Sequence, residues 1–260
     1  MSGGETVWVG TLASLLAGLG TAVGGLGVLF IRRLSERMED ILLSMAAGIM
    51  LAASFFSLLL PAISYGEAQF GAKVPAVAIV IAGLLLGALA LHVLNRVVPH
   101  EHFFTGREGP DTATLKRIWL FVIAITIHNF PEGMAVGVGF AGGDMANGTA
   151  LATGIGLQNI PEGLAVAVSL LAAKYTRAQA FAIAALTGLV EPVGGLLGAV
   201  AIWLAAPLMP VTLGFAAGAM LFVISDEIIP ETHRRGLENA ATFSLMGGFA
   251  AMMFLDATLG

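Results

Sequence analysis

Apolar runs of roughly 20 residues, the length that a helix needs to cross a bilayer, recur along the whole chain. Hydrophobic residues make up 57% of the 260 residues, and charged residues make up only 11%. A soluble domain carries about 25% charged residues. Because backbone polar groups in hydrocarbon must be satisfied internally, such runs have to be helices. We therefore expect an all-α, polytopic membrane bundle.

The apolar runs predict eight transmembrane helices within a single transmembrane domain, residues 1–260. The expected spans cover about 6–31, 41–64, 74–98, 117–140, 148–173, 178–205, 211–230 and 240–259. The loops between them are short, apart from a polar segment at about 99–116.

Basic residues are distributed unevenly between the loops. Of the twelve, only Lys73 falls on one side of the expected topology. The other eleven fall in alternate loops: Arg32, Arg33, Arg37, Arg96, Arg107, Lys116, Arg117, Lys174, Arg177, Arg234 and Arg235. Because cytoplasmic loops carry an excess of Lys and Arg, we expect the 99–116 loop in the cytoplasm and both termini outside it.

One motif occurs twice in the centre of the chain. The segment His128–Val138 returns thirty residues later as Gln158–Val168, with seven of eleven positions identical. The copies lie on spans 4 and 5, which run in opposite directions, so they form an inverted pair about the membrane midplane. Such pairs are common in secondary transporters. We therefore expect a 3+2+3 inverted-repeat arrangement, with spans 1–3 and 6–8 flanking the pair.

Carboxylates lie near the centres of three spans. Glu132 follows His128 by one helical turn and shares its face, and Glu162 follows Gln158 in the same way. Glu191 lies at the centre of span 6. Each ionised group at mid-bilayer costs roughly 2.5–3.5 kcal/mol. Since no basic residue lies near mid-span, a bound cation is the remaining strong compensation.

The donor types narrow the choice of cation. Imidazole with carboxylate suits Zn²⁺, Fe²⁺, Mn²⁺, Co²⁺ or Cd²⁺, whereas sites made only of oxygen suit Mg²⁺ or Ca²⁺. The chain has no cysteine, which excludes thiolate sites and disulfides. Pro131 and Pro161 each remove a backbone donor beside the carboxylates and free a carbonyl one turn back.

The two motifs, His-Asn-x-Pro-Glu-Gly and Gln-Asn-x-Pro-Glu-Gly, resemble those of the ZIP (Zrt/Irt-like) metal transporters, especially the bacterial GufA-like branch. The resemblance covers essentially the whole chain. It implies a homodimer in the lipid bilayer of a bacterial inner membrane. It also implies uptake of Zn²⁺, and of Cd²⁺, Fe²⁺ or Mn²⁺, into the cytoplasm.

The resemblance further implies a binuclear metal centre. One metal would bind His128, Glu132, Gln158 and Glu162, and the other Asn129, Asn159, Glu162 and Glu191, with Glu162 as the bridge. The position of Asn159 is frequently acidic in the family. A neutral amide there removes one charge, so we expect the second site to bind metal more weakly.

Residues along a path through the membrane are weaker candidates. Metal would enter past Met50 and Asp256, and it would leave past Asp226, Glu227, Glu231, His100 and His102. Each has an ordinary alternative, which is core packing for Met50 and solvation at a helix end or loop for the others. We expect His92 to be a hydrogen-bonded packing residue.

Two other functions remain as alternatives. A proton-coupled carrier of an organic solute would also need carboxylates inside the membrane, but it would not account for His128 and the paired amides. A metalloprotease is disfavoured because the His-Glu-x-x-His pattern is absent. We therefore expect neither an enzyme nor a resident cofactor, and the scattered basic residues give no indication of a nucleic-acid partner.

Overall fold

The computed structural model describes residues 3–31, 33–97, 100–102, 106–108, 117–141, 143–173, 175–233 and 236–259. Helices dominate this part of the chain. In order, the elements are α1 (Gly3–Gly25), η1 (Leu26–Leu29), α2 (Glu36–Ala53), η2 (Ser54–Leu59), α3 (Leu60–Phe70), α4 (Lys73–Val97), β1 (His100–His102), β2 (Gly106–Glu108), α5 (Arg117–Ala141), α6 (Met145–Ala172), α7 (Arg177–Gly188), α8 (Glu191–Leu204), η3 (Ala206–Leu208), α9 (Met209–Val223), η4 (Ile224–Ile228), α10 (Ile229–Thr232) and α11 (Glu238–Leu259). The only strands described, β1 and β2, form a short antiparallel pair within the expected loop at 99–116.

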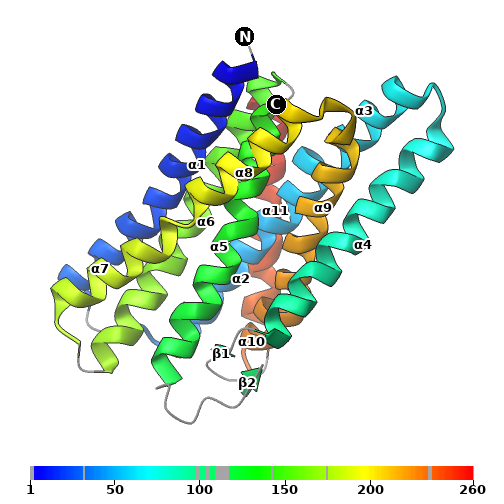
Figure 1. Cartoon of the computed structure of the whole chain (residues 1–260). Helices are drawn as coiled ribbons and strands as arrows, with labels where there is room; N and C mark the ends of the chain where they lie inside the picture. The colour runs from blue at the N-terminus through cyan, green and yellow to red at the C-terminus, as the bar shows by residue number, and fades with distance from the viewer. Residues whose placement is uncertain are drawn as a thin grey trace.

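Seven helical segments of the described residues are long and apolar enough to cross a membrane. They are Gly3–Leu29, Glu36–Phe70, Lys73–Val97, Met145–Ala172, Arg177–Leu204, Ala206–Thr232 and Glu238–Leu259. Helix α5, with 25 residues, covers the fourth expected span and lies among them (Figure 1). The expectation of a polytopic helical bundle is therefore confirmed.

Local signals at the helix ends agree with these bounds. Three N-cap side chains accept hydrogen bonds from backbone N–H groups of the first turn: Ser35 before α2, Asp144 before α6 and Thr176 before α7. Gly71 ends α3 in the left-handed conformation, with φ 67°, which glycine adopts without a steric penalty.

Three of the expected spans are interrupted instead of continuous. The second and seventh contain the π-helical segments η2 and η4, each followed by a proline, Pro61 or Pro230. A wide turn before a proline accommodates the missing backbone donor. The sixth is broken between α7 and α8, just before Glu191 and Pro192, because Pro192 has no backbone N–H to continue the hydrogen bonding of α7. By contrast, α5 and α6 continue through Pro131 and Pro161.

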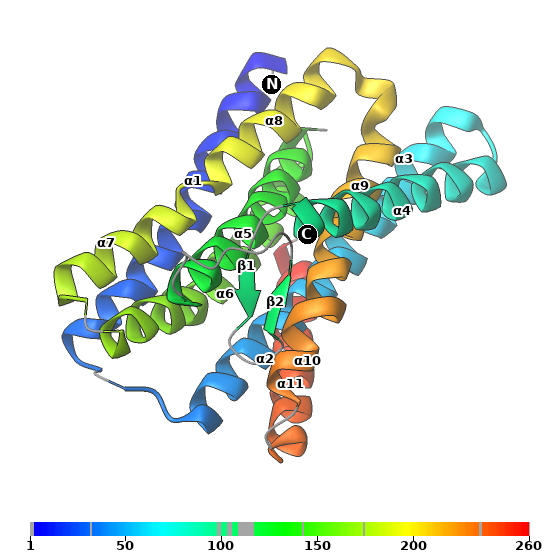
Figure 2. The ribbon, with the colours of Figure 1, turned by 60° about the horizontal axis from the view of Figure 1, so that its bottom comes forward.

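The helices form two groups, which lie side by side in Figures 1 and 2. Helices α1, α5, α6, α7 and α8 form the first, here called the α5–α6 bundle. Helices α2, α3, α4, α9, α10 and α11, with η2 and η4, form the second, here called the α2–α9 bundle. The groups meet mainly where α2 and α11 pack on α6 and where α9 packs on α5.

The packing pairs reveal the inverted repeat. In the α5–α6 bundle, α1 packs on α6 in the same way that α8 packs on α5. In the α2–α9 bundle, α4 packs on α9 as α11 packs on α2. Exchanging spans 1–3 with 6–8, and α5 with α6, maps each pair onto the other. The π-helical segments lie in spans 2 and 7, which this exchange also relates.

The glycines of the doubled motif allow backbones to touch. A Cβ atom added at Gly133 of α5 would collide with the backbone of Glu191, and one added at Gly163 of α6 would collide with the backbone of Thr21. Such close approach is how small residues join helices in lipid. The same motif position therefore fixes α5 against α8 and α6 against α1.

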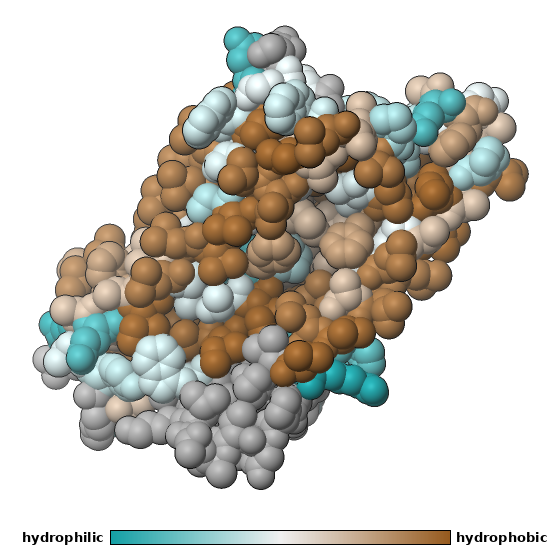
Figure 3. Space-filling model, in the orientation of Figure 1, coloured by the Kyte–Doolittle hydropathy of each residue, from teal (hydrophilic) through white to brown (hydrophobic). Residues whose placement is uncertain are grey.

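Polarity varies along the bundle axis. The start of α1 and the end of α11 lie at one end of the bundle, and the strands β1 and β2 lie near the other (Figure 1). Apolar residues cover the middle of the face in Figure 3. Five of the basic residues expected on the cytoplasmic side lie outside the described residues: Arg32, Lys116, Lys174, Arg234 and Arg235.

Candidate metal site

The polar residues of the doubled motif are buried together with Glu191. None of them exposes more than 6% of its surface: His128, Asn129 and Glu132 on α5, Gln158, Asn159 and Glu162 on α6, and Glu191 at the start of α8. Helical spacing places the residues of each motif on one face. The interruption before α8 places the Glu191 carboxylate at the first turn of a new helix.

Amide side chains connect the three helices. Gln158 donates from Nε2 to Glu132 Oε1 at 2.7 Å. Asn159 donates from Nδ2 to Glu191 Oε1 at 2.7 Å and to the carbonyl oxygen of Ala17 at 2.9 Å. Each amide therefore holds one oxygen of a carboxylate and leaves its own carbonyl oxygen available.

Six buried oxygen atoms of this cluster accept no hydrogen bond from the described residues. They are Oε2 of Glu132, Glu162 and Glu191, Oε1 of Gln158, and Oδ1 of Asn129 and Asn159. Buried polar atoms normally have a partner, and leaving one without a partner costs roughly 1–3 kcal/mol. A group of oxygens like this one suits a bound cation.

The carboxylates share one electrostatic environment. Glu162 interacts electrostatically with Glu132, with Glu191 and with the His128 imidazole, and Glu132 interacts with Glu191 as well. In the described segments, however, no three His, Asp or Glu side chains converge closely enough to hold a metal ion. The carboxylates therefore share a polar core without forming a closed ligand cage.

His128 makes a contact that the sequence did not suggest. Its Nε2 atom contacts Oε2 of Glu227, which belongs to η4 and is only 2% exposed. Asn95 of α4 donates from Nδ2 to the other oxygen, Glu227 Oε1, at 2.8 Å. Glu227 is thus an interior residue and not a solvated helix end. The pattern Glu227-Ile-Ile-Pro-Glu231 could have indicated it as an echo of the doubled motif, whereas nothing singled out Asn95.

The remaining path candidates differ in their surroundings. Met50 is buried in the core of α2, and Asp256 on α11 accepts a hydrogen bond from Ser57 Oγ at 2.7 Å. Asp226 is exposed and Glu231 is half-buried. His92 lies edge-on to the ring of Phe222.

Two further candidates lie in β1. His100 and His102 belong to this strand, and their side chains are outside the described part of the chain.

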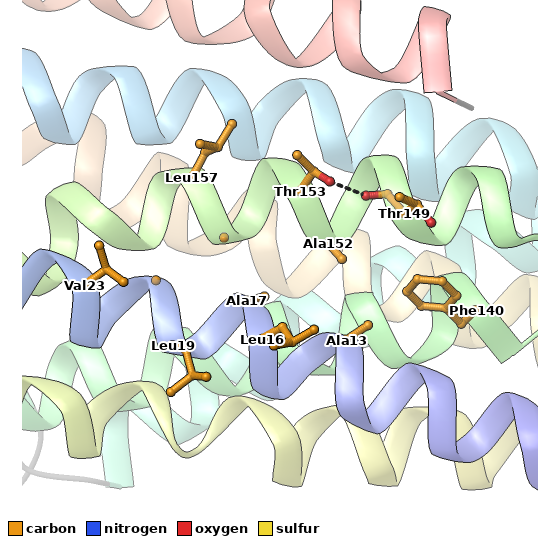
Figure 4. A pocket seen from close by; sticks show the side chains of 12 residues that line it. Ala13, Leu16, Ala17, Leu19, Val23, Phe140, Thr149, Ala152, Thr153 and Leu157 are labelled. Carbon is orange, nitrogen blue, oxygen red and sulfur yellow. Dashed lines mark hydrogen bonds between the residues drawn. The ribbon is translucent and has the colours of Figure 1, made fainter.

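A separate groove of about 510 Å³ lies between α1 and α6 (Figure 4). Its walls are almost entirely apolar, and the Thr153 hydroxyl that lines it donates to the Thr149 carbonyl oxygen at 2.7 Å. None of the cluster residues lines it. The groove is therefore distinct from the candidate metal site.

Comparisons with known proteins agree with the resemblance of the motifs. The ZIP Zinc transporter family profile matches residues 98–256. Zinc transporter ZIPB of Bordetella bronchiseptica is 47% identical over 240 residues, which are 92% of this chain and 78% of the relative. Zinc transporter GufA of Myxococcus xanthus is 46% identical over 252 residues, 96% of this chain and 99% of the relative. Human zinc transporter ZIP11 is 32% identical over the full length of both chains. The chain therefore belongs to the ZIP family, within its GufA-like bacterial branch.

Proposed function

We propose that this protein transports divalent transition-metal ions across the membrane into the cytoplasm, with Zn²⁺ as the principal substrate and Cd²⁺, Fe²⁺ and Mn²⁺ as others. The observation that carries the proposal is the group of buried oxygens beside His128 that accept no hydrogen bond within the described part of the chain. A mobile dication would satisfy these oxygens and offset the charge of the carboxylates. The names of the relatives, which are zinc transporters, support Zn²⁺ as the substrate.

Two adjacent positions are proposed for the metal. The first uses His128, Glu132, Gln158 and Glu162, and the second uses Asn129, Asn159, Glu162 and Glu191. The electrostatic interactions of Glu162 with His128 and Glu132 of the first position and with Glu191 of the second support its role as the bridging ligand. Gln158 and Asn159 each have a carbonyl oxygen that accepts no hydrogen bond from any residue the structure describes, which supports their roles as neutral ligands.

Transport requires the site to face each side of the membrane in turn. We propose that the α5–α6 bundle moves against the α2–α9 bundle, because α5 and α6 are fixed to α8 and α1 by backbone contacts at Gly133 and Gly163. Metal would enter past Met50 and Asp256 and leave past Glu227 and Glu231, then toward His100 and His102. Asp226 is a less favourable path residue because it is exposed.

The cellular setting belongs to the same proposal. The whole 260-residue chain acts as one transport domain in a bacterial inner membrane, with the basic loops in the cytoplasm and both termini outside. Helices α4 and α11 are the least buried of the candidate spans and offer apolar faces for a homodimer. The protein acts as a transporter and not as an enzyme.

Uptake into proteoliposomes tests the assignment. We expect His128→Ala and Glu162→Ala to reduce Zn²⁺ and Cd²⁺ uptake by at least tenfold, because each removes a proposed ligand. His92→Ala is the matched control, since His92 also lies within a span but packs against Phe222 and is not among the proposed ligands. Unchanged uptake by both ligand variants would refute the proposed site.

A further inference from the structure

The contact between His128 and Glu227 crosses from one bundle to the other. His128 belongs to α5 in the α5–α6 bundle, whereas Glu227 belongs to η4 in the α2–α9 bundle. Both side chains are buried, at 6% and 2% exposure. A contact enclosed in this way is little screened by solvent. It directly joins the two parts that we propose to move.

Asn95 holds the Glu227 carboxylate in this position. Its amide nitrogen donates to Oε1, the oxygen that does not face His128, at 2.8 Å. Asn95 is 1% exposed and lies on α4, which packs along α9 within the same bundle as Glu227. The wide turn η4 contributes as well, because it leaves Asp226 exposed while Glu227 lies inside.

A metal ion and Glu227 cannot use the same nitrogen of His128 at the same time. An imidazole nitrogen that contacts a carboxylate as a donor carries a hydrogen, and it then has no lone pair for a metal. Nε2 is the nitrogen that contacts Glu227. If His128 binds the transported metal through Nε2, the contact with Glu227 must first open.

We infer that Asn95, Glu227 and His128 form a latch, a contact that joins the two bundles. The latch is closed in the metal-free protein, and it opens when a divalent cation binds His128 Nε2 in place of the Glu227 carboxylate. The inference rests on the proposed function, because it needs His128 as a ligand. It assigns Asn95 as a positioning residue that never touches the metal. It also links occupation of the site to release of the bundles, so that an empty transporter stays locked at this contact.

The opposite arrangement makes the opposite prediction. A carboxylate commonly orients a metal-bound histidine by accepting a hydrogen bond from its other nitrogen. If Glu227 did this, or if it bound the metal itself, loosening Glu227 would weaken metal binding. If Glu227 competes with the metal, loosening it tightens metal binding, because a larger fraction of the protein is ready to bind. The sign of the change therefore separates the two roles.

Asn95→Leu gives the first test, because it removes the hydrogen bond to Glu227 and leaves every charge in place. We expect the Kd of the purified protein for Zn²⁺, measured by calorimetry in detergent, to fall about fivefold, which corresponds to about 1 kcal/mol. His92→Leu is the control, because His92 lies on the same helix and its ring packs against Phe222 of α9, and the Kd of this variant should not change. A Kd for Asn95→Leu that is unchanged or higher would overturn the latch.

Distances between the bundles give the second test, which does not depend on affinity. The chain has no native cysteine, so Ala178→Cys on α7 and Asn239→Cys on α11 can carry a unique pair of spin labels. Both positions are exposed. We expect Zn²⁺ to shift the label distance in the otherwise native protein, and Glu227→Gln to produce the same shift without metal. If metal-free Glu227→Gln keeps the native distance, the contact does not lock the bundles.

His128→Ala separates failure of the latch from failure of the proposed function. If His128→Ala weakens Zn²⁺ binding while Asn95→Leu also weakens it, the site stands and the latch is wrong. If His128→Ala leaves Zn²⁺ binding unchanged, His128 is not a ligand and both ideas fail. Apparent melting temperature and a single size-exclusion peak establish that each variant is folded before its Kd is compared.

Discussion

Two glycines of α6 should respond in opposite directions to the same substitution. A Cβ atom at Gly163 would meet backbone atoms of Thr21 well inside 3.0 Å, where no side-chain rotation can relieve the contact. A Cβ atom at Gly156 would meet the Ala17 Cα atom at 3.5 Å, which is an ordinary contact. Both residues lie inside α6 and face α1. Gly163→Ala therefore forces α1 and α6 apart, whereas Gly156→Ala does not.

The magnitude follows from two opposing effects. Alanine is favoured over glycine inside a helix by about 1 kcal/mol, which benefits both variants. Overpacking a close contact costs about 1–3 kcal/mol, and only Gly163→Ala incurs it. We expect Gly156→Ala to be as stable as the native protein or slightly more stable, and Gly163→Ala to be less stable than the native protein by up to about 2 kcal/mol.

Thermal unfolding of the two variants in detergent measures the difference. The apparent melting temperature of Gly163→Ala should fall about 2–6 °C below that of Gly156→Ala. Zn²⁺ affinity should fall with it, because separation of α6 from α1 disturbs the bond from Asn159 to the Ala17 carbonyl oxygen and moves the adjacent Glu162. Equal stability of the two variants would show that α1 and α6 do not touch at Gly163, and the account of the motif glycine would be wrong.

Two further predictions concern the metal itself. Asn159→Asp should add a charged ligand to the second position and lower its Kd for Zn²⁺ by about tenfold, which calorimetry resolves as a second binding event; loss of all binding would argue against that position. Zn²⁺ uptake below saturation should fall as the external pH is lowered from neutral toward about pH 5, because imidazole and carboxylate ligands must lose their protons to bind metal. Faster uptake on acidification would instead favour proton-coupled transport.

The local parts of the site could be predicted from the sequence because they depend on short-range spacing. His128 and Glu132 share a helix face wherever that helix lies, and the same holds for Gln158 and Glu162. Apolar length similarly determined the helical bundle, since hydrocarbon permits few alternatives. These are properties of single segments, so a linear pattern was sufficient.

Contacts between distant segments could not be predicted in the same way. The contact between Glu227 and His128 depends on a π-helical segment that changes which side chains face inward, and sequence periodicity assumes a regular α-helix. Asn95 acquires its role only because α4 packs along α9. The correspondence of spans 1–3 with 6–8 was expected from topology and became visible only in the helix contacts.

The matched helix pairs also bear on how the two ends of the chain compare. Both ends use one set of helix pairings although their sequences show no visible repeat, so helix spacing is matched more closely than side-chain identity. A proline after each wide turn, Pro61 and Pro230, is among the few features common to both ends. Such pairs identify positions where a change in one half would be expected to have a counterpart in the other, even though the two halves no longer align.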